Sequence, residues 1–378
     1  MNDHELRSAG LYEPGVDDPK KAALIRRCLE IGLTVEEIRE AGDDLIDRAV
    51  QRVLGSGDER FTMTDVADRA DIPLSRIEKI SAASAIAGAG AGPDDRIFDE
   101  RDVVMMSTIG LAFDLLGEDA VLQLIRVATA AVVRLGDASM STFLTSVGAA
   151  ASRDDESGLQ LLEANIAAME LLPLFGDTLA HMLLRYMRQA YRPRSESSLT
   201  SALAEGLDTR KLAVGFADLV GSTTLTDNRS LADLSAALDA FEQAATDTIT
   251  TGGGRVVKFI GDEVMFRADT ADAACAMAID LVKFLRTDPL LPPLRVGIAF
   301  GDVLSREGDF YGSTVNLAAR VTKLAPLHGV VTTIATIDAL HDQTHFEVHP
   351  LGAIEMQGLS KPVELASLSP RSAQHADQ

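Results

Sequence analysis

Two aspartates stand at the ends of apolar runs, where their carboxylates could do chemistry. Asp218 follows the run 212–217, and Asp262 lies in the turn between the runs 256–260 and 264–266. These runs have the length and composition of buried strands. Two carboxylates that meet at the ends of neighbouring strands are what a two-metal site for phosphate chemistry requires. Taken singly, each aspartate is also explained as a solvated turn residue.

Small residues follow Asp218 and lead into a helical pattern. The backbone N–H groups of Gly221, Ser222 and Thr223 could hold phosphate oxygens there. Gly261 permits a tight turn beside Asp262. Since Mg²⁺ commonly takes one or two carboxylates plus substrate phosphate, the pattern allows a metal–phosphate site. The glycines alone are more typical of ordinary turns.

The residues after Lys211 must form a sheet if the two carboxylates are to meet. Strand-like runs occur at 212–220, 255–260, 263–267, 294–301, 330–334 and 346–349, and helical patterns at 230–250, 270–286 and 314–325. The order strand-helix-strand-strand-helix-strand is ferredoxin-like (βαββαβ). We therefore predict an α+β domain with a mostly antiparallel sheet over residues 209–369, followed by a polar tail, 370–378.

The first half has a helical rhythm instead. Apolar residues recur at three- and four-residue spacing over 20–30, 35–54, 64–70, 74–87, 100–116, 119–135 and 159–190, with breaks at 55–57, 88–93 and 153–155. This pattern predicts an all-α domain over residues 1–191. The polar, proline-containing stretch 192–208 is typical of a linker or hinge.

The composition narrows the classes of partner and compartment. A formal net charge of −22 argues against a nucleic-acid surface, because phosphate binding needs clustered Lys and Arg. Cys28 and Cys275 form no metal or redox motif, which suits a reducing cytoplasm. The apolar windows 120–151 and 159–191 are interrupted by charges, so we expect buried helices of a soluble domain and no transmembrane segment.

Four motifs in the second half resemble those of the class III nucleotide cyclases. In chain order they are Phe216-Ala217-Asp218-Leu219-Val220-Gly221-Ser222-Thr223, Lys258-Phe259-Ile260-Gly261-Asp262, Asp309-Phe310-Tyr311-Gly312 and Asn316-Leu317-Ala318-Ala319-Arg320. The resemblance covers about Thr209 to Ser369. It implies an adenylate cyclase that converts ATP to 3′,5′-cyclic AMP and pyrophosphate.

The resemblance also implies a role for individual residues. It assigns Asp218, Leu219 and Asp262 to two Mg²⁺ or Mn²⁺ ions per active site. Lys258 and Asp309 match the pair that reads adenine, because an ammonium donates to a ring nitrogen and a carboxylate accepts from the amino group.

On the helical pattern that follows, the resemblance makes Asn316 the residue that orients the ribose. Arg320 matches the residue that offsets charge on the transferring phosphoryl group. Their i, i+4 spacing puts both on one helix face. Taken singly, such residues are more often surface charges or helix caps. Because they occur here in the same order as in the family motifs, the functional interpretation is favoured.

One position departs from the family pattern. Where relatives commonly carry a lysine before a glycine to bind the triphosphate, this chain has Gln357 before Gly358. Lys361 lies four residues on and could reach the phosphates instead, or be a plain exposed residue beside Pro362.

The resemblance implies a homodimer in which each active site takes its metal residues from one chain and its adenine-, ribose- and phosphate-contacting residues from the other. The chain further resembles soluble actinobacterial adenylate cyclases whose helical N-terminal domain is regulatory. We expect this domain to be autoinhibitory and to respond to pH or to a lipid-like ligand. His181 could serve a pH response, although a neutral core histidine explains it as well.

Three other readings stay open. The hairpin around Asp262 is close to that of a diguanylate cyclase, but the motifs at Asp309 and Asn316 are then unexplained. A non-catalytic nucleotide-binding signalling module is supported by Gln357. Residues 61–79 resemble a DNA-binding helix-turn-helix, although a structural helix pair is favoured because little basic surface follows Arg76 and Lys79.

Overall fold

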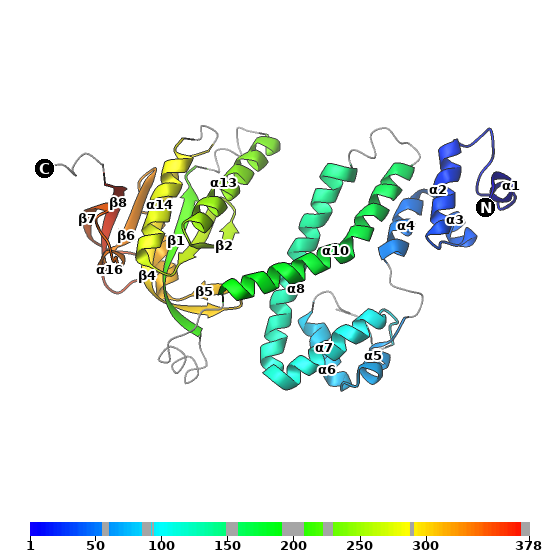
Figure 1. Ribbon diagram of the computed structural model, residues 1–378, viewed down its shortest axis with the longest axis horizontal. Coiled ribbons are helices and arrows are strands. Elements are labelled where there is room, and N and C mark those ends of the chain that lie inside the picture. The colour runs from blue at the N-terminus through cyan, green and yellow to red at the C-terminus, as the bar shows by residue number, and fades with distance from the viewer. Residues whose placement is uncertain are drawn as a thin grey trace. The chain divides into compact units, whose positions relative to one another are not determined.

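The computed structural model describes residues 1–54, 60–84, 92, 94–148, 158–190, 208–221, 230–287 and 291–371. The chain divides into two compact units, Met1–Pro193 and Arg194–Gln378 (Figure 1). The predicted breaks at 55–57 and 153–155, nearly all of 88–93 and nearly all of the predicted linker lie outside the described residues.

Helices make up the described part of the N-terminal unit. They are α1 (Asp3–Ser8), α2 (Pro19–Glu30), α3 (Val35–Ala41), the 3₁₀ turn η1 (Gly42–Asp44), α4 (Leu45–Leu54), α5 (Met63–Ala70), α6 (Leu74–Ala83), α7 (Glu100–Leu116), α8 (Glu118–Thr142), the π-helical η2 (Phe143–Gly148) and α10 (Leu159–Ala190). Side-chain caps fix several starts: Thr34, Thr62 and Asp99 each accept from a backbone N–H three residues on. One predicted helix, 35–54, is interrupted at Gly42, whose φ of 51° an α-helix does not allow.

The N-terminal unit has two separate hydrophobic cores. One joins α2, α3 and α4 to the start of α10 through Leu162 and Ile166. The other joins α5, α6 and α7 to the start of α8 through Val121. Only the first turns of the two longest helices therefore reach a core.

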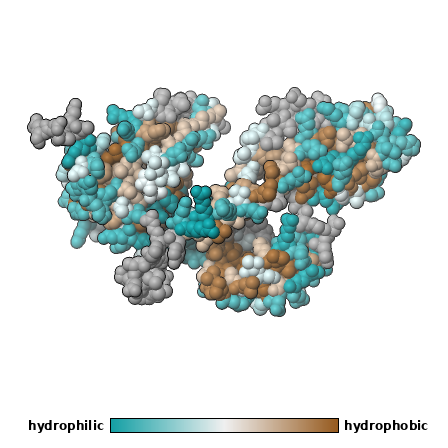
Figure 2. Space-filling model, viewed as in Figure 1, coloured by the Kyte–Doolittle hydropathy of each residue, from teal (hydrophilic) through white to brown (hydrophobic). Residues whose placement is uncertain are grey.

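Most of the rest of α8 and α10 that the structure describes is exposed in the single chain, so the prediction that both are buried helices is wrong at this level. Figure 2 shows apolar residues gathered on the visible face of the N-terminal unit. Val132 and Met140 on α8 and Leu172 and Leu183 on α10 are all more than half exposed. His181 is exposed too, which rules out the core-histidine reading. Among the described helices, α10 is also long and apolar enough to cross a membrane, a property it shares with core helices of soluble proteins.

The cations of the helix-turn-helix-like segment are occupied within the unit. Arg76 pairs with Asp114 at 3.2 Å, and Lys79 pairs with Glu118. Both acids belong to the α7–α8 corner. This arrangement favours the structural helix pair over DNA binding, because neither cation is free for a phosphate.

The C-terminal unit is one mixed sheet with helices on both faces. Its elements are β1 (Asp208–Leu219), α13 (Leu231–Thr251), β2 (Arg255–Ile260), β3 (Glu263–Ala268), α14 (Ala271–Leu285), β4 (Leu294–Arg306), β5 (Asp309–Tyr311), α15 (Ser313–Thr322), β6 (Gly329–Thr333), α16 (Ile334–Asp338), β7 (Phe346–Ile354) and β8 (Val363–Pro370). The strand order is β2-β3-β1-β4-β6-β8-β7, with β5 on β4. Only β4 and β6 run parallel, since α15 crosses over between them. The predicted α+β class with a ferredoxin-like start is confirmed.

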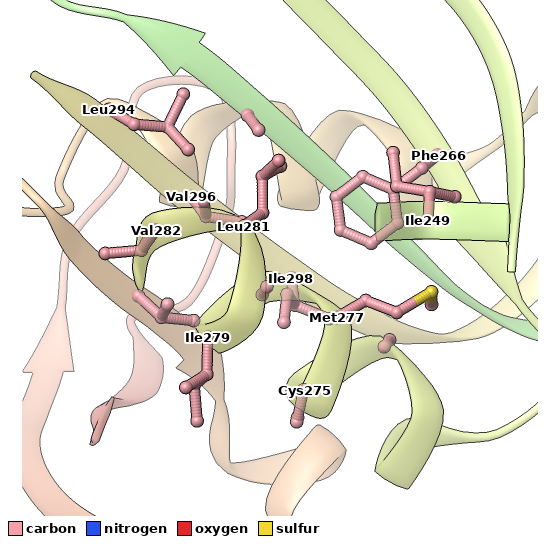
Figure 3. Packing of buried hydrophobic residues seen from close by; sticks show 14 of the residues in the cluster. Ile249, Phe266, Cys275, Met277, Ile279, Leu281, Val282, Leu294, Val296 and Ile298 are labelled. Carbon is pink, nitrogen blue, oxygen red and sulfur yellow. The ribbon is translucent and has the colours of Figure 1, made fainter. Parts of the chain in front are cut away.

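Alternation along the strands builds a core on each face of the sheet. One face packs under α13 and α14, where Met277, Leu281 and Val282 of α14 meet Val296 and Ile298 of β4 (Figure 3). On the other face, α15 covers a smaller core. Because successive residues of β1 point to opposite faces, Asp218 lies on the α15 face with Val214 and Phe216.

Candidate active site

The two predicted metal aspartates lie at the same end of the sheet. Asp218 is the last residue but one of β1 and stands opposite Glu263 of β3 in the antiparallel register. The N–H of Leu219 donates to the backbone carbonyl of Asp262 at 3.2 Å, which ties the end of β1 to the β2–β3 turn. Gly261 has a φ of 64°, which that turn requires.

Arg295 of β4 is a site residue that the sequence analysis missed. It stands opposite Asp218 in the β1–β4 register, and its Nε donates to Asp218 Oδ2 at 2.8 Å. The two side chains are only 26% and 17% exposed. One signal was available: Arg295 is a single charge in the otherwise apolar run 294–300.

Negative charge exceeds positive charge around Asp218. Burial raises the pKa of Glu263, and the neighbouring carboxylates of Asp218 and Asp262 raise it further, against the opposing effect of Lys323 and Arg295. An oxygen-only set of donors with uncompensated negative charge fits Mg²⁺ or Mn²⁺. Across the described residues, no three His, Cys, Asp or Glu side chains converge as a complete metal cage.

Lys258 and Asp309 form an ion pair, although 51 residues separate them. A β-bulge in β2 makes this possible: Val256 faces Phe266 in the core under α13 and α14, whereas Lys258 faces Met265 on the α15 side. The N–H of Phe310 donates to Asp309 Oδ1 at 2.8 Å, so the carboxylate is held at both oxygens. The pair is therefore pre-oriented.

The helix α15 carries Asn316 and Arg320. It packs closely on β4, since a Cβ at Gly297 would come within 2.1 Å of the backbone nitrogen of Thr322. Asn316 is exposed. The guanidinium of Arg320 lies against Gly358, with Nη2 3.3 Å from where a Cβ would stand, and its Nη1 is buried without a hydrogen-bond partner among the described residues.

The loop between β7 and β8 forms a cavity of about 450 Å³ beside this glycine. Both Gln357 and Lys361 line it, together with Glu355, Met356, Leu359, Ser360 and Pro362. The two positions raised by the sequence for the triphosphate therefore share one cavity, in a loop that contacts Arg320 through Gly358.

The structure pairs some of the predicted residues within the single chain. Asp218 forms an ion pair with Arg295, and Lys258 forms an ion pair with Asp309. The two ion pairs share no residue. Gly221 lies in the turn after β1, with a φ of 86°. Ser222 and Thr223 lie outside the described residues.

Two family models match the chain. Residues 207–368 match the adenylate and guanylate cyclase catalytic domain, and residues 9–191 match the adenylate cyclase regulatory domain. An adenylate cyclase of Streptomyces coelicolor is 31% identical over 80% of this chain and 77% of its own length.

Two further similarities were found. A pH-sensitive adenylate cyclase of Mycobacterium tuberculosis is 28% identical over 87% of this chain and 82% of its own length. Among solved structures, an adenylyl cyclase of P. aeruginosa is 23% identical, with a TM-score of 0.40, and covers 44% of this chain and 96% of its own length.

Proposed function

This chain belongs to the class III adenylate cyclases, and we propose that its C-terminal unit converts ATP to 3′,5′-cyclic AMP and pyrophosphate through the residues described above. The observation that carries the choice of adenine is the Lys258–Asp309 pair. Its ammonium can donate to a ring nitrogen of adenine, and its carboxylate can accept from the amino group. Guanine presents the opposite pattern and would meet two mismatched groups.

Asp218, the backbone carbonyl of Leu219 and Asp262 would hold two Mg²⁺ or Mn²⁺ ions. When bound, such ions lower the pKa of the ribose 3′-hydroxyl and offset charge on the triphosphate. Arg295 donates to Asp218 Oδ2, and a metal ion that took this oxygen would release the guanidinium towards the substrate phosphates. The β1 turn at Gly221, with Ser222 and Thr223, would add backbone N–H donors to the same phosphates.

Asn316, Arg320 and Lys361 would contact the ribose and the phosphates of the nucleotide. Asn316 would orient the ribose so that its hydroxyl attacks in line, and Arg320 would offset the charge that builds on the α-phosphoryl group. The unpartnered Nη1 of Arg320 supports this role, since a buried guanidinium nitrogen without an acceptor is costly until an anion arrives. Lys361 would bind the outer phosphates from the β7–β8 loop in place of a lysine at 357.

The active enzyme would be a homodimer with two shared sites. In each site, Asp218 and Asp262 of one copy face Lys258, Asp309, Asn316 and Arg320 of the other. Support comes from the single chain, in which the two groups are formed separately. A two-fold axis turns two such different half-sites into two equivalent active sites.

The N-terminal unit would regulate the enzyme by autoinhibition, released by a proton or a lipid-like effector. Its support is the match to a regulatory-domain model and the relative described as pH-sensitive. On α10, His181 stands one helical turn from both Asp177 and Arg185. We place the enzyme in the cytoplasm, where its substrate is found and where free thiols such as Cys28 and Cys275 persist.

A nucleotide assay on the purified chain tests this function. With Mg²⁺ or Mn²⁺, across pH, ATP should yield cyclic AMP, and the Asp218→Ala variant should yield none. A product from GTP alone, such as a cyclic dinucleotide, would instead support the diguanylate-cyclase-like reading. Nucleotide binding without any product would support the non-catalytic signalling module.

A further inference from the structure

A tight turn in the β7–β8 loop lies directly against the guanidinium of Arg320. The N–H of Leu359 donates to the backbone carbonyl of Met356 at 3.1 Å, which closes a four-residue turn. The third residue of the turn, Gly358, has a φ of 80°, the value that a type II turn requires there and that glycine or asparagine supplies. The backbone of the turn alone therefore does not restrict this position to glycine.

The contact with Arg320 sets a stricter limit than the turn does. A Cβ at Gly358 would stand 3.3 Å from Nη2, 3.8 Å from Nη1 and 3.9 Å from Cζ of Arg320. The first distance is shorter than an ordinary van der Waals contact, so the guanidinium would have to shift by a few tenths of an ångström. Glycine leaves the guanidinium where it stands, whereas any residue with a Cβ displaces it.

A small hydrophobic core fixes this loop to the helix that carries Arg320. Val321 of α15 is fully buried in that core, and Met356 near the start of the loop and Val363 just after its end both pack against it. Close-packed cores hold their neighbours in one arrangement, because each shift opens a void or makes a clash. The place of Gly358 beside Arg320 is therefore set by packing on both sides of the loop.

We propose that Gly358 is a positioning residue for Arg320: the missing side chain leaves the guanidinium in the place where it offsets charge on the α-phosphoryl group. The inference rests on the role proposed above for Arg320. An electrostatic stabiliser works because it is aimed before the reaction begins, so a small displacement weakens it. Since this charge builds only in the transition state, the loss falls on kcat more than on KM.

Asparagine at two glycines separates the contact from the backbone. Gly352 of β7 also has a φ of 80°, but a Cβ there would meet nothing within 4 Å. In the full-length chain, Gly358→Asn should lower kcat for cyclic AMP formation by about 10-fold and change the KM for ATP by less than about 3-fold, whereas Gly352→Asn should leave both within about 2-fold. Alanine at the two positions carries the same Cβ atoms and gives the same comparison if an asparagine variant does not fold. Equal losses at both glycines would overturn the proposal, since backbone strain would then explain them.

A double-mutant cycle shows whether Gly358 acts through Arg320. Arg320→Lys keeps a cation but lacks the nitrogens that lie against the glycine, and it should lower kcat by about 30-fold because lysine cannot grip two phosphate oxygens at once. Adding Gly358→Asn to this variant should cost less than about 2-fold more. The same loss from Gly358→Asn in both backgrounds would overturn the inference and leave the role of Arg320 standing. An Arg320→Lys chain as active as wild type would overturn that role, and the inference with it.

Discussion

At the scale of single residues, the proposed choice of adenine depends on two side chains that meet only because of the fold. The Lys258–Asp309 pair is closed in the single chain and is braced by the N–H of Phe310. A nucleotide base that replaces this contact must offer a donor to the carboxylate and an acceptor to the ammonium. Adenine offers both, so in the proposed complex the pair would exchange one partner for another without leaving a charge unsatisfied.

Replacing Lys258 by Met tests the adenine contact. We expect kcat/KM for ATP to fall by about 100-fold, because adenine loses a donor and Asp309 loses its partner. The matched control is Arg306→Met, which removes an exposed cation from the β4–β5 hairpin and should change kcat/KM less than about 3-fold. Equal small effects of both would mean that adenine is read elsewhere.

The β7–β8 loop makes a second prediction at this scale. Lys361→Met should raise the KM for ATP by about 10-fold with a smaller change in kcat, since it removes a charge that contacts the triphosphate in ground and transition states alike. Adding Gln357→Lys to that variant should restore the KM, because both positions line one cavity. No rise in KM for Lys361→Met would make Lys361 a plain surface residue.

Local sequence patterns identified the candidate site residues that stand in motifs. They did not identify a residue whose place in the site depends on the pairing register of two strands. Asp218, Lys258 and Asn316 stand in recognisable motifs. Arg295 does not: it acts because β4 pairs with β1 in a register that sets it opposite Asp218. That pairing joins residues 77 apart in sequence, which no local pattern records.

At the scale of elements, the periodicity of apolar residues correctly predicted the helices whose pattern is local. The helices at 100–116 and 159–190 have the predicted bounds. It missed β8 entirely, stopped β4 at Gly301 instead of Arg306, and gave no sign of the bulge in β2. These features depend on partners: β8 is held between β6 and β7, the end of β4 by β5, and the bulge by its register against β3.

The hydrogen bonds between Asp272 of α14 and the segment after α16 predict that the stability of the fold depends on pH. Burial alone would raise the pKa of Asp272, but hydrogen bonds from His341 and Asp342 outweigh it and lower the pKa to about 2. A carboxyl with a depressed folded-state pKa stabilises the fold above its unfolded value of 3.8, and this stabilisation is lost as pH falls towards 2.

Asp272→Ala should therefore lower the melting temperature by roughly 2–4 °C at pH 7. The difference from wild type should shrink between about pH 4 and pH 2, in thermal scans at each pH. Asp280→Ala, at an exposed position on the same helix, should cost little at any pH. A deficit for Asp272→Ala that is constant across the whole range would show that the carboxylate charge is not what stabilises this contact.

At the scale of the whole molecule, each unit is incomplete in its own way. The catalytic unit holds two separate ion pairs of candidate site residues, and in the helical unit most of α8 and α10 beyond their first turns is exposed. In the proposed homodimer, a second copy of the chain would complete each active site. In that proposal, regulation would act on the pairing of two chains, because an effector that changed this pairing would change the shared sites.

Complementation tests the shared active site most directly. Asp218→Ala and Asn316→Ala chains should each be inactive alone, by loss of the metal site and of ribose orientation. When the two are mixed and allowed to exchange, about half of the dimers are mixed, and each mixed dimer keeps one intact site. The account predicts recovery of roughly a quarter of the wild-type cyclic AMP production from ATP. A mixture that forms mixed dimers yet stays as inactive as its parents would contradict it.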